Sequence, residues 1–160
     1  MIMSSHEETE DFFEHFQSGV FFEDEEEKEY PLMIFPFPPV PKPRMTQSDR
    51  WKVGDKKRKA VKNYHDFRDR FRKTMERNDW IVDANMLIRI KMYIPMAKSW
   101  SKKVKKAMEG MPHKQKPDID NLEKGILDAL YEDDSRVWDL HATKYWTNSE
   151  GSFTIQNIEE

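Results

Sequence analysis

Four aspartates form two groups in the second half of the chain. Asp118 and Asp120 are separated by one residue, and Asp133 and Asp134 are adjacent further along the chain. Hard cations such as Mg²⁺ bind oxygen ligands, and carboxylates are the usual protein source of these ligands. The four side chains are therefore candidate ligands of a metal ion.

A lysine, Lys124, lies between the two groups of aspartates in the sequence. Asp120, Lys124 and Asp128 recur every four residues, which places them on one face of a helix. A lysine beside carboxylates can hold a scissile phosphate, or stabilise the negative charge that develops as the phosphate ester is cleaved. Lys124 is therefore a candidate catalytic residue.

Each candidate also has a purely structural interpretation. Asp118 could serve only as a helix N-cap, because aspartate there accepts hydrogen bonds from free backbone N–H groups. The pairs along the helix could be solvated ion pairs, each worth a few tenths of a kcal/mol. Asp133 and Asp134 could simply form a turn. The spacing leaves both interpretations open.

The apolar pattern predicts a single α+β domain with a small mixed sheet of about four strands and helices packed on it. Apolar residues every three or four positions indicate helices, and alternation indicates strands. A turn around residues 148–151 suggests that the last two strands form a hairpin. The second acidic pair can reach the first only if the chain turns back along the third strand. The expected strands are 30–37, 84–95, 137–147 and 151–158, and the expected helices are 58–79, 119–131 and a short one within 98–116, capped by Ser99 or Ser101.

Charge is distributed unevenly along the chain. Residues 1–30 contain 11 of the 30 acidic residues and one basic residue, so the remainder carries a net charge of +7. We expect a flexible acidic arm at 1–29, followed by a domain at 30–160. A basic domain favours a polyanion partner, because Lys and Arg displace counterions from phosphates; a lysine-rich surface without a partner is the alternative. The candidate DNA-binding residues are Lys42, Arg44, Lys102, Lys103, Lys105, Lys106 and Lys116.

Composition excludes several other classes of protein. The chain has 160 residues, the length of one domain, and no cysteine, which excludes disulfides and cysteine–zinc sites and suits a reducing cytoplasm. It has no apolar stretch long enough to span a membrane and no pattern of a signal peptide. We therefore expect no membrane partner.

The acidic motifs resemble those of the RusA family of Holliday junction resolvases. The segment Lys116 to Leu122, with Lys124 and the segment Asp128 to Leu130, is similar to the core motif of the family. The segment from Glu132 to Val137 resembles its second motif. The proline-rich segment 36–44 and the segment 99–103 are also similar to those of phage members, and the similarity extends from about Leu32 to Ile158.

The resemblance implies a homodimeric endonuclease of bacteria or phages that binds four-way DNA junctions and makes paired symmetrical nicks, using Mg²⁺ or Mn²⁺. Asp118 and Asp120 match the first two metal-binding acids, and Lys124 matches the active-site lysine. Asp134 matches the third acid best, with Asp133 beside it. The link between the helix and the second motif is shorter here than in the best-known members, so the choice between these two aspartates stays open. The acidic arm has no counterpart.

Two other functions fit the same residues. The chain could be a non-catalytic DNA-binding phage protein, in which the aspartates are caps and turns. It could also be an interaction protein whose acidic arm binds a basic partner or mimics DNA. Metal-dependent cleavage distinguishes the first from a nuclease, and deletion of the arm tests the second.

Overall fold

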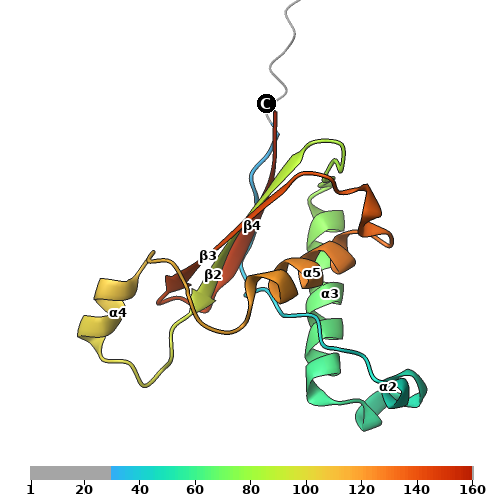
Figure 1. Cartoon of the computed structure of the whole chain (residues 1–160), viewed down its shortest axis with the longest axis horizontal. Helices are drawn as coiled ribbons and strands as arrows, with labels where there is room; N and C mark the ends of the chain where they lie inside the picture. The colour runs from blue at the N-terminus through green and yellow to red at the C-terminus, as the bar shows by residue number, and fades with distance from the viewer. Residues whose placement is uncertain (1–29, 160) are drawn as a thin grey trace, which may run out of the picture.

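The computed structural model describes residues 30–159, so the expected acidic arm lies outside the described residues. The chain contains four strands, four α-helices and two short 3-10 helices (η1 and η2) within these residues (Figure 1). In chain order the elements are β1 (Met33–Phe35), α2 (Gln47–Trp51), η1 (Gly54–Lys56), α3 (Lys59–Arg77), β2 (Leu87–Pro95), α4 (Lys102–Met108), α5 (Ile119–Leu130), η2 (Asp134–Arg136), β3 (Leu140–Thr147) and β4 (Ser152–Ile158).

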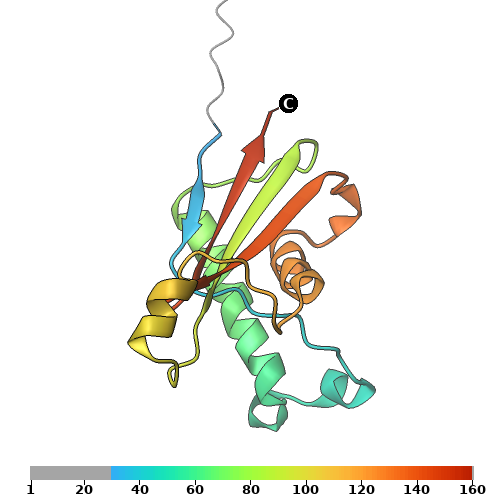
Figure 2. The same cartoon turned by 60° about the vertical axis from the view of Figure 1, so that its left-hand side comes forward.

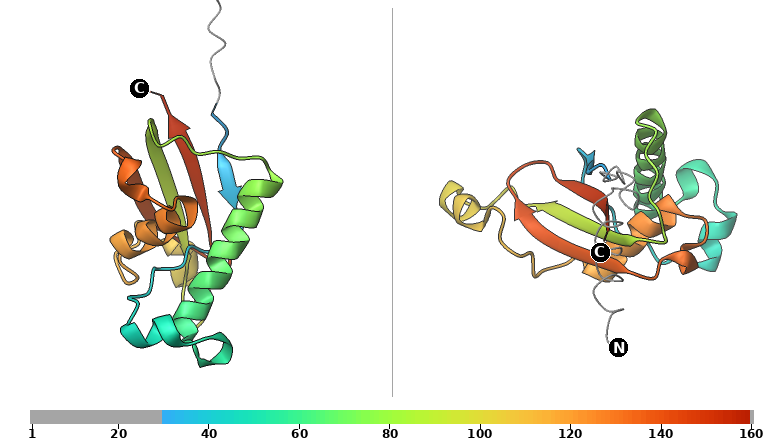
Figure 3. Two further views of the ribbon diagram at one scale, coloured as in Figure 1. Left: turned by 90° about the vertical axis from the view of Figure 1, so that its right-hand side faces the viewer. Right: turned by 90° about the horizontal axis from the view of Figure 1, so that it is seen from above.

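The four strands form one mixed sheet in the order β1-β4-β2-β3. β2 pairs with β3 in parallel and with β4 in antiparallel, and β4 also pairs with β1 in antiparallel. Helices α3 and α5 lie on the same side of the sheet, as the views in Figures 2 and 3 show. This architecture confirms the predicted α+β domain with a four-stranded mixed sheet.

The core lies between this face of the sheet and the two helices. β2 alternates as predicted, with Ile88, Ile90 and Met92 fully buried and the residues between them exposed. Phe35 of β1 stacks on Phe153 of β4, with ring centroids 4.6 Å apart, and on Phe71 of α3, at 4.8 Å. Stacked aromatic rings contribute about 0.5–1.5 kcal/mol each beyond the area they bury. The cluster fixes α3 against β1 and β4.

The expected hairpin of the last two strands is wrong. β3 and β4 are consecutive in the chain but lie on opposite edges of β2. Residues 148–151 therefore cross the end of β2 instead of forming a tight turn between partners. Gly151 makes this crossing possible: its φ is +98°, and a Cβ there would lie 2.8 Å from Pro38 and 3.0 Å from Pro95. The sequence contains a turn signal, but it does not say which strands pair.

Several expected boundaries also change. β1 is shorter than the predicted 30–37, because Pro31 and Pro36 lack the N–H that a ladder needs. β3 begins at Leu140, since η2 occupies the residues before it. The segment after the prolines contains α2 and η1, which are not among the expected helices. The predicted helices agree with α3, α4 and α5, and Ser101 caps α4 by accepting a hydrogen bond from the Val104 N–H.

In residues 30–159, the helices are too short or too polar to cross a lipid bilayer.

Candidate active site

The first acidic motif lies at the N-terminal end of α5. Asp118 is the N-cap residue, yet its side chain makes no capping hydrogen bond, and it is exposed. Asp120, in the first turn, is also exposed. In the described residues, neither carboxylate takes part in a hydrogen bond or ion pair. The purely structural interpretation of Asp118 as a side-chain cap therefore does not describe this helix, and its carboxylate oxygens are free to bind a ligand.

The loop that precedes Asp118 is held by a lysine from the sheet. Lys144 of β3 donates hydrogen bonds to the carbonyl oxygens of Gln115 and Pro117, each at 2.6 Å. In the parallel ladder Lys144 pairs with Met92, which points into the core, so it projects from the helix-covered face of the sheet. An ammonium group on that face needs acceptors to offset its desolvation. Sequence analysis did not identify this residue, although its alternation with the apolar Leu140 and Ala142 along the same strand is a signal.

Lys124 joins α5 to the second acidic motif. Its Nζ lies 3.8 Å from Asp128 Oδ1, the expected contact between residues four apart on a helix, and 3.8 Å from Asp134 Oδ2. The chain after α5 therefore turns back onto the helix. Lys42 completes the cluster, because its Nζ lies 2.6 Å from Asp128 Oδ2. The structure thus brings Lys124, Asp128 and Asp134 together with Lys42.

The two aspartates of the second motif have different surroundings. Asp133 Oδ1 accepts a hydrogen bond from the Ser135 N–H at 3.0 Å and caps η2. Hydrogen bonds from Ser135 lower the pKa of Asp133. The turn interpretation therefore applies to Asp133, whereas Asp134 faces Lys124.

Glu123 is a further acid beside the first motif that sequence analysis did not single out. It is half-buried one helical turn after Asp120. Burial, and then the charge of Asp120, raise the pKa of Glu123. Its position three residues after Asp120 is the only signal in the sequence.

The proline-rich segment packs directly against α5. A Cβ on residue 125 would lie 2.4 Å from the Val40 carbonyl oxygen, so only glycine fits at Gly125. The Lys42 N–H donates to Asn121 O at 3.1 Å, and the Tyr64 hydroxyl donates to Gly125 O at 3.0 Å. Burial, and then the charge of Asp128, raise the pKa of Tyr64 to about 12. These contacts set the position of Lys42 beside Asp128.

The donor chemistry of the acidic side chains fits a divalent cation. Asp118, Asp120 and Asp134 offer oxygen ligands only, which suits Mg²⁺, and the Asp118 and Asp120 carboxylates have no competing partner in the described residues. Within residues 30–159, however, no three acidic or histidine side chains converge into a metal-binding group. The structure therefore joins the second motif to Lys124 without drawing the two acidic motifs into one cluster.

Helix α4 carries the predicted basic residues away from the body (Figure 1). None of its residues is buried, and Lys102, Lys103 and Lys106 are exposed. Its base is held by Trp146, whose ring centroid lies 4.8 Å from that of Trp100 and 4.0 Å from that of His113. Lys116 is also exposed, two residues before Asp118, and Arg44 is exposed at the end of the proline-rich segment.

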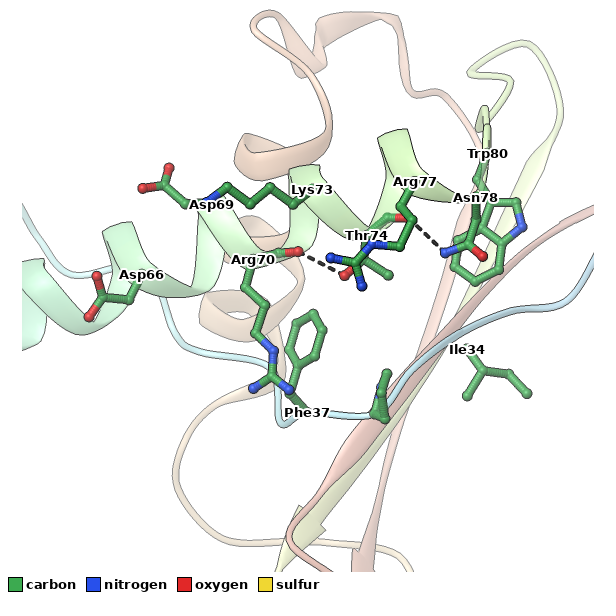
Figure 4. Close-up of a pocket in the computed structure, with 11 residues that line it drawn as sticks. Ile34, Phe37, Asp66, Asp69, Arg70, Lys73, Thr74, Arg77, Asn78 and Trp80 are labelled. Atoms are coloured by element: carbon green, nitrogen blue, oxygen red, sulfur yellow. Dashed lines mark hydrogen bonds between the residues drawn. The ribbon is translucent and has the colours of Figure 1, made fainter.

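A large cavity lies apart from these residues, between β1 and α3. It measures about 710 Å³, and the residues that line it come from β1, α3 and the loops that follow them. Figure 4 shows Arg70 reaching from α3 to Phe37, where its guanidinium carbon lies 4.3 Å from the ring centroid. Neither acidic motif contributes to this lining.

The fold and these side chains define a class: a small α+β protein with free carboxylates at a helix end, a lysine beside a second acidic motif, and an exposed basic helix. The sequence matches the family model of Endodeoxyribonuclease RusA over residues 36–156. The chain therefore belongs to the RusA endodeoxyribonuclease family, which confirms the resemblance.

A curated relative is also similar. The chain is 39% identical over 82 residues to Uncharacterized protein YqaN of Bacillus subtilis (strain 168). The match covers 46% of this chain and 58% of the relative, so the chain spans somewhat more than half the length of that protein.

Proposed function

We propose that this chain is a Mg²⁺-dependent, structure-selective endodeoxyribonuclease that resolves four-way DNA junctions by paired symmetrical nicks in recombination and repair. The observation that carries the proposal is the return of Asp134 to Lys124 in a chain of the RusA family. This contact brings the lysine of the first motif to an aspartate of the second motif. The substrate is branched DNA, in the cytoplasm of a bacterial or phage-infected cell.

Asp118, Asp120 and Asp134 are the residues that would hold the metal ion, with Asp133 beside them. Mg²⁺ suits the all-oxygen donor set, and Mn²⁺ is expected to substitute for it. A bound divalent cation supplies Lewis-acid chemistry, which stabilises the charge that develops on a phosphodiester during cleavage.

The remaining residues bind and orient the DNA. Lys124 would contact the scissile phosphate, and its exposed side chain on the side of α5 that faces Asp134 supports this role. Lys144 holds the loop that carries Asp118 through two carbonyl groups. Phosphate contacts fix the register of the DNA without reading sequence, a role that suits Arg44, Lys116 and the α4 lysines Lys102, Lys103, Lys105 and Lys106. Lys42 would also contact a phosphate of the DNA, from its position beside Asp128.

Paired nicks require two active sites. A homodimer with two-fold symmetry supplies them, because a closed symmetric dimer presents the same surface twice in opposite directions. A four-way junction has a matching two-fold axis. We therefore propose a homodimer as the active form.

A non-catalytic DNA-binding protein is the second candidate. One observation favours it: the described residues contain no converged group of three metal-binding side chains. In that case Asp133 is a turn residue, as its bond to Ser135 indicates, and the basic helix α4 provides the function. An interaction protein that acts through its acidic arm would depend on residues outside the described part of the chain.

Cleavage of defined DNA distinguishes the candidates. A labelled four-way junction and a linear duplex of the same sequence are incubated with the full chain in Mg²⁺, in Mn²⁺ and in EDTA. We expect paired, ligatable nicks in the junction with either metal, none in EDTA, and little cutting of the duplex. The doubly substituted chain Asp118→Asn/Asp120→Asn is the control, which should bind the junction and leave it intact. Binding by the wild-type chain without metal-dependent nicks would support the non-catalytic candidate instead.

A further inference from the structure

Two of the most exposed apolar side chains of the described residues lie on the segment 42–58. Trp51, at the end of α2, is 85% exposed, and Val53, which follows it, is 80% exposed. Single exposed apolar residues are normal on protein surfaces. Exposure alone therefore says little, and the surroundings of Trp51 decide its meaning.

The backbone that carries Trp51 is held in one conformation by an ion pair between the buried Asp49 and Arg58, whose side chain is 44% exposed. Asp49 is only 3% exposed and accepts hydrogen bonds from Arg58 Nε at 3.0 Å and from the Thr46 N–H at 2.8 Å. The bond from Arg58 holds the pKa of Asp49 well below its usual range. Arg58 also donates to the Arg44 carbonyl oxygen at 2.6 Å. Arg58 thus fixes the backbone before Trp51, while the indole ring of Trp51 is exposed to solvent.

A pair with one buried partner adds little net stability, because the desolvation of Asp49 offsets its attraction to Arg58, and its use here is to specify one backbone arrangement. Here the arrangement that Asp49 and Arg58 specify has Trp51 outside the core. An indole ring that served only packing would lie against the body of the protein. The Asp49–Arg58 ion pair therefore holds the aromatic ring of Trp51 where a binding partner can contact it.

The surrounding charge indicates what that partner is. Residues 42–58 contain seven Lys or Arg residues and two Asp residues. Arg50 and Lys52 flank Trp51 directly, and Arg50 is exposed. Aromatic rings among cations are the composition with which proteins bind unpaired nucleotides: the ring stacks on a base while the cations contact phosphates.

The segment also begins at the candidate active site. Its first residue, Lys42, is hydrogen-bonded to Asn121 of α5 and paired with Asp128. In Figures 1 and 3, α2 lies beyond the N-terminal end of α3, on the side of α3 where α5 packs. DNA bound at Lys124 would therefore run close to the segment that presents Trp51.

We propose that Trp51 is a base-stacking residue that makes binding selective for branched DNA. In a linear duplex every base is stacked on both sides, so an indole ring finds no free face without costly unstacking. At a branch point the bases at the exchange have a face that can be uncovered at lower cost. Arg50 and Lys52 would contact the adjoining phosphates. The inference rests on the proposed function, because it requires branched DNA at this site.

The test compares Trp51→Ala and Trp51→Phe with a matched tryptophan. Trp138 is 71% exposed, and its indole N–H donates to Asn85 O before β2, away from α2, so Trp138→Ala is the control. Affinities for a four-way junction and a linear duplex are measured by fluorescence anisotropy in EDTA, so that no cleavage intervenes. A 2-aminopurine base at the branch point reports unstacking. Circular dichroism verifies that each variant is folded.

For Trp51→Ala we expect about a tenfold decrease in junction affinity, within the range measured for removal of one base–aromatic stack. Duplex affinity should stay nearly unchanged, and the rise in 2-aminopurine fluorescence on binding should disappear. Trp51→Phe should retain most of the affinity, and Trp138→Ala should match the wild type.

Three outcomes would overturn the inference. Unchanged junction affinity in Trp51→Ala shows that the ring does not touch the DNA, and an equal decrease on both substrates shows that it does not select branched DNA. If Trp51→Ala gives the same rise in 2-aminopurine fluorescence as the wild type, no base at the branch point stacks on Trp51. If the wild type prefers and cuts the junction while Trp51→Ala behaves identically, only this inference fails. If the wild type shows no preference for the junction, the proposed function fails with it.

Discussion

At the scale of single residues, the contacts of Asp133 and Asp134 assign them different roles. Asp133 holds the 3-10 turn through the Ser135 N–H, and Asp134 faces Lys124. The resemblance favoured Asp134, but the neighbouring positions of the two residues left the choice open. The side chain that is already committed to the backbone is the weaker candidate for a metal ligand.

Asparagine substitutions separate the two aspartates. Asp134→Asn should reduce junction cleavage in Mg²⁺ by at least about 100-fold, the upper end of what removal of even an outer-shell partner of a metal costs. Asp133→Asn should stay close to the wild type, because its amide oxygen can still accept from the Ser135 N–H. Both variants should bind the junction in EDTA. A larger decrease in Asp133→Asn than in Asp134→Asn would reverse the assignment.

Lys144 should act as a positioning residue for Asp118. Lys144→Met leaves the Gln115 and Pro117 carbonyl groups without their donor, so the loop before Asp118 no longer has a fixed position. We expect roughly tenfold slower cleavage, as for other supporting residues of metal sites, and a higher Mg²⁺ concentration for half-maximal rate. Lys144→Arg should restore part of the activity. A decrease in thermal stability with an unchanged Mg²⁺ dependence would show that Lys144 is merely structural.

At the scale of elements, α4 is a cationic helix without a share in the core. It buries none of its residues and is anchored at its base by the packing of Trp100 and His113 on Trp146. Its lysines can therefore change without affecting the fold. This separation of binding from stability makes α4 the element in which the electrostatic part of DNA binding can be measured alone.

Neutralising Lys102, Lys103, Lys105 and Lys106 to glutamine should weaken binding to junction and duplex alike. The slope of log K against log salt should become shallower by about 0.9 for each phosphate that the variant no longer neutralises. Arg89→Gln/Lys91→Gln, on exposed positions of β2, is the control and should leave the slope unchanged. An unaltered slope in the α4 variant would exclude phosphate binding by this helix.

The anchor of α4 should respond to pH through His113. This side chain is 4% exposed, and its Nδ1 has no hydrogen-bond partner among the described residues. Burial, and then the charge of Lys144, lower the pKa of His113 below 6.5. Below pH 6.5 the unfolded chain binds a proton at His113 that the folded chain does not bind. The free energy of unfolding therefore decreases as pH falls.

Urea unfolding at a series of pH values tests this dependence. We expect stability to decline as pH drops below 6.5, and His113→Phe to flatten the decline. His65, whose pKa is also lowered by burial and by Arg68, should account for part of the remaining slope, which His65→Phe would remove. Identical slopes in wild type and His113→Phe would show that His113 binds its proton equally well in the folded chain.

At the scale of the whole molecule, charge is divided between an acidic segment at 1–29 and a basic domain. We expect a variant that begins at Tyr30 to fold, because the core residues of the sheet start at Met33. At low salt it should bind linear duplex more tightly than the full chain, and the difference should fade at high salt as the charges are screened. Equal duplex affinities at low salt would leave the acidic segment as a solubilising tail.

Local order was predictable from the sequence, because it depends on residues close together in the chain. The apolar stripe of α3, the alternation of β2 and the serine cap of α4 each follow from the spacing of a few side chains. The two acidic motifs were found in the same way, by residue type and separation. The α+β class followed from the order of these elements.

Partners that are distant in the sequence were decided only by the tertiary structure. β3 and β4 are neighbours in the chain but not in the sheet, because β2 has two edges and the spacing does not say which edge each strand takes. The packing of those elements also decides three polar contacts: Lys144 supports the Asp118 loop, Lys124 contacts Asp134, and Asp49 pairs with Arg58. Periodicity specifies which face of an element is apolar, whereas the packing of the elements determines which polar side chains meet.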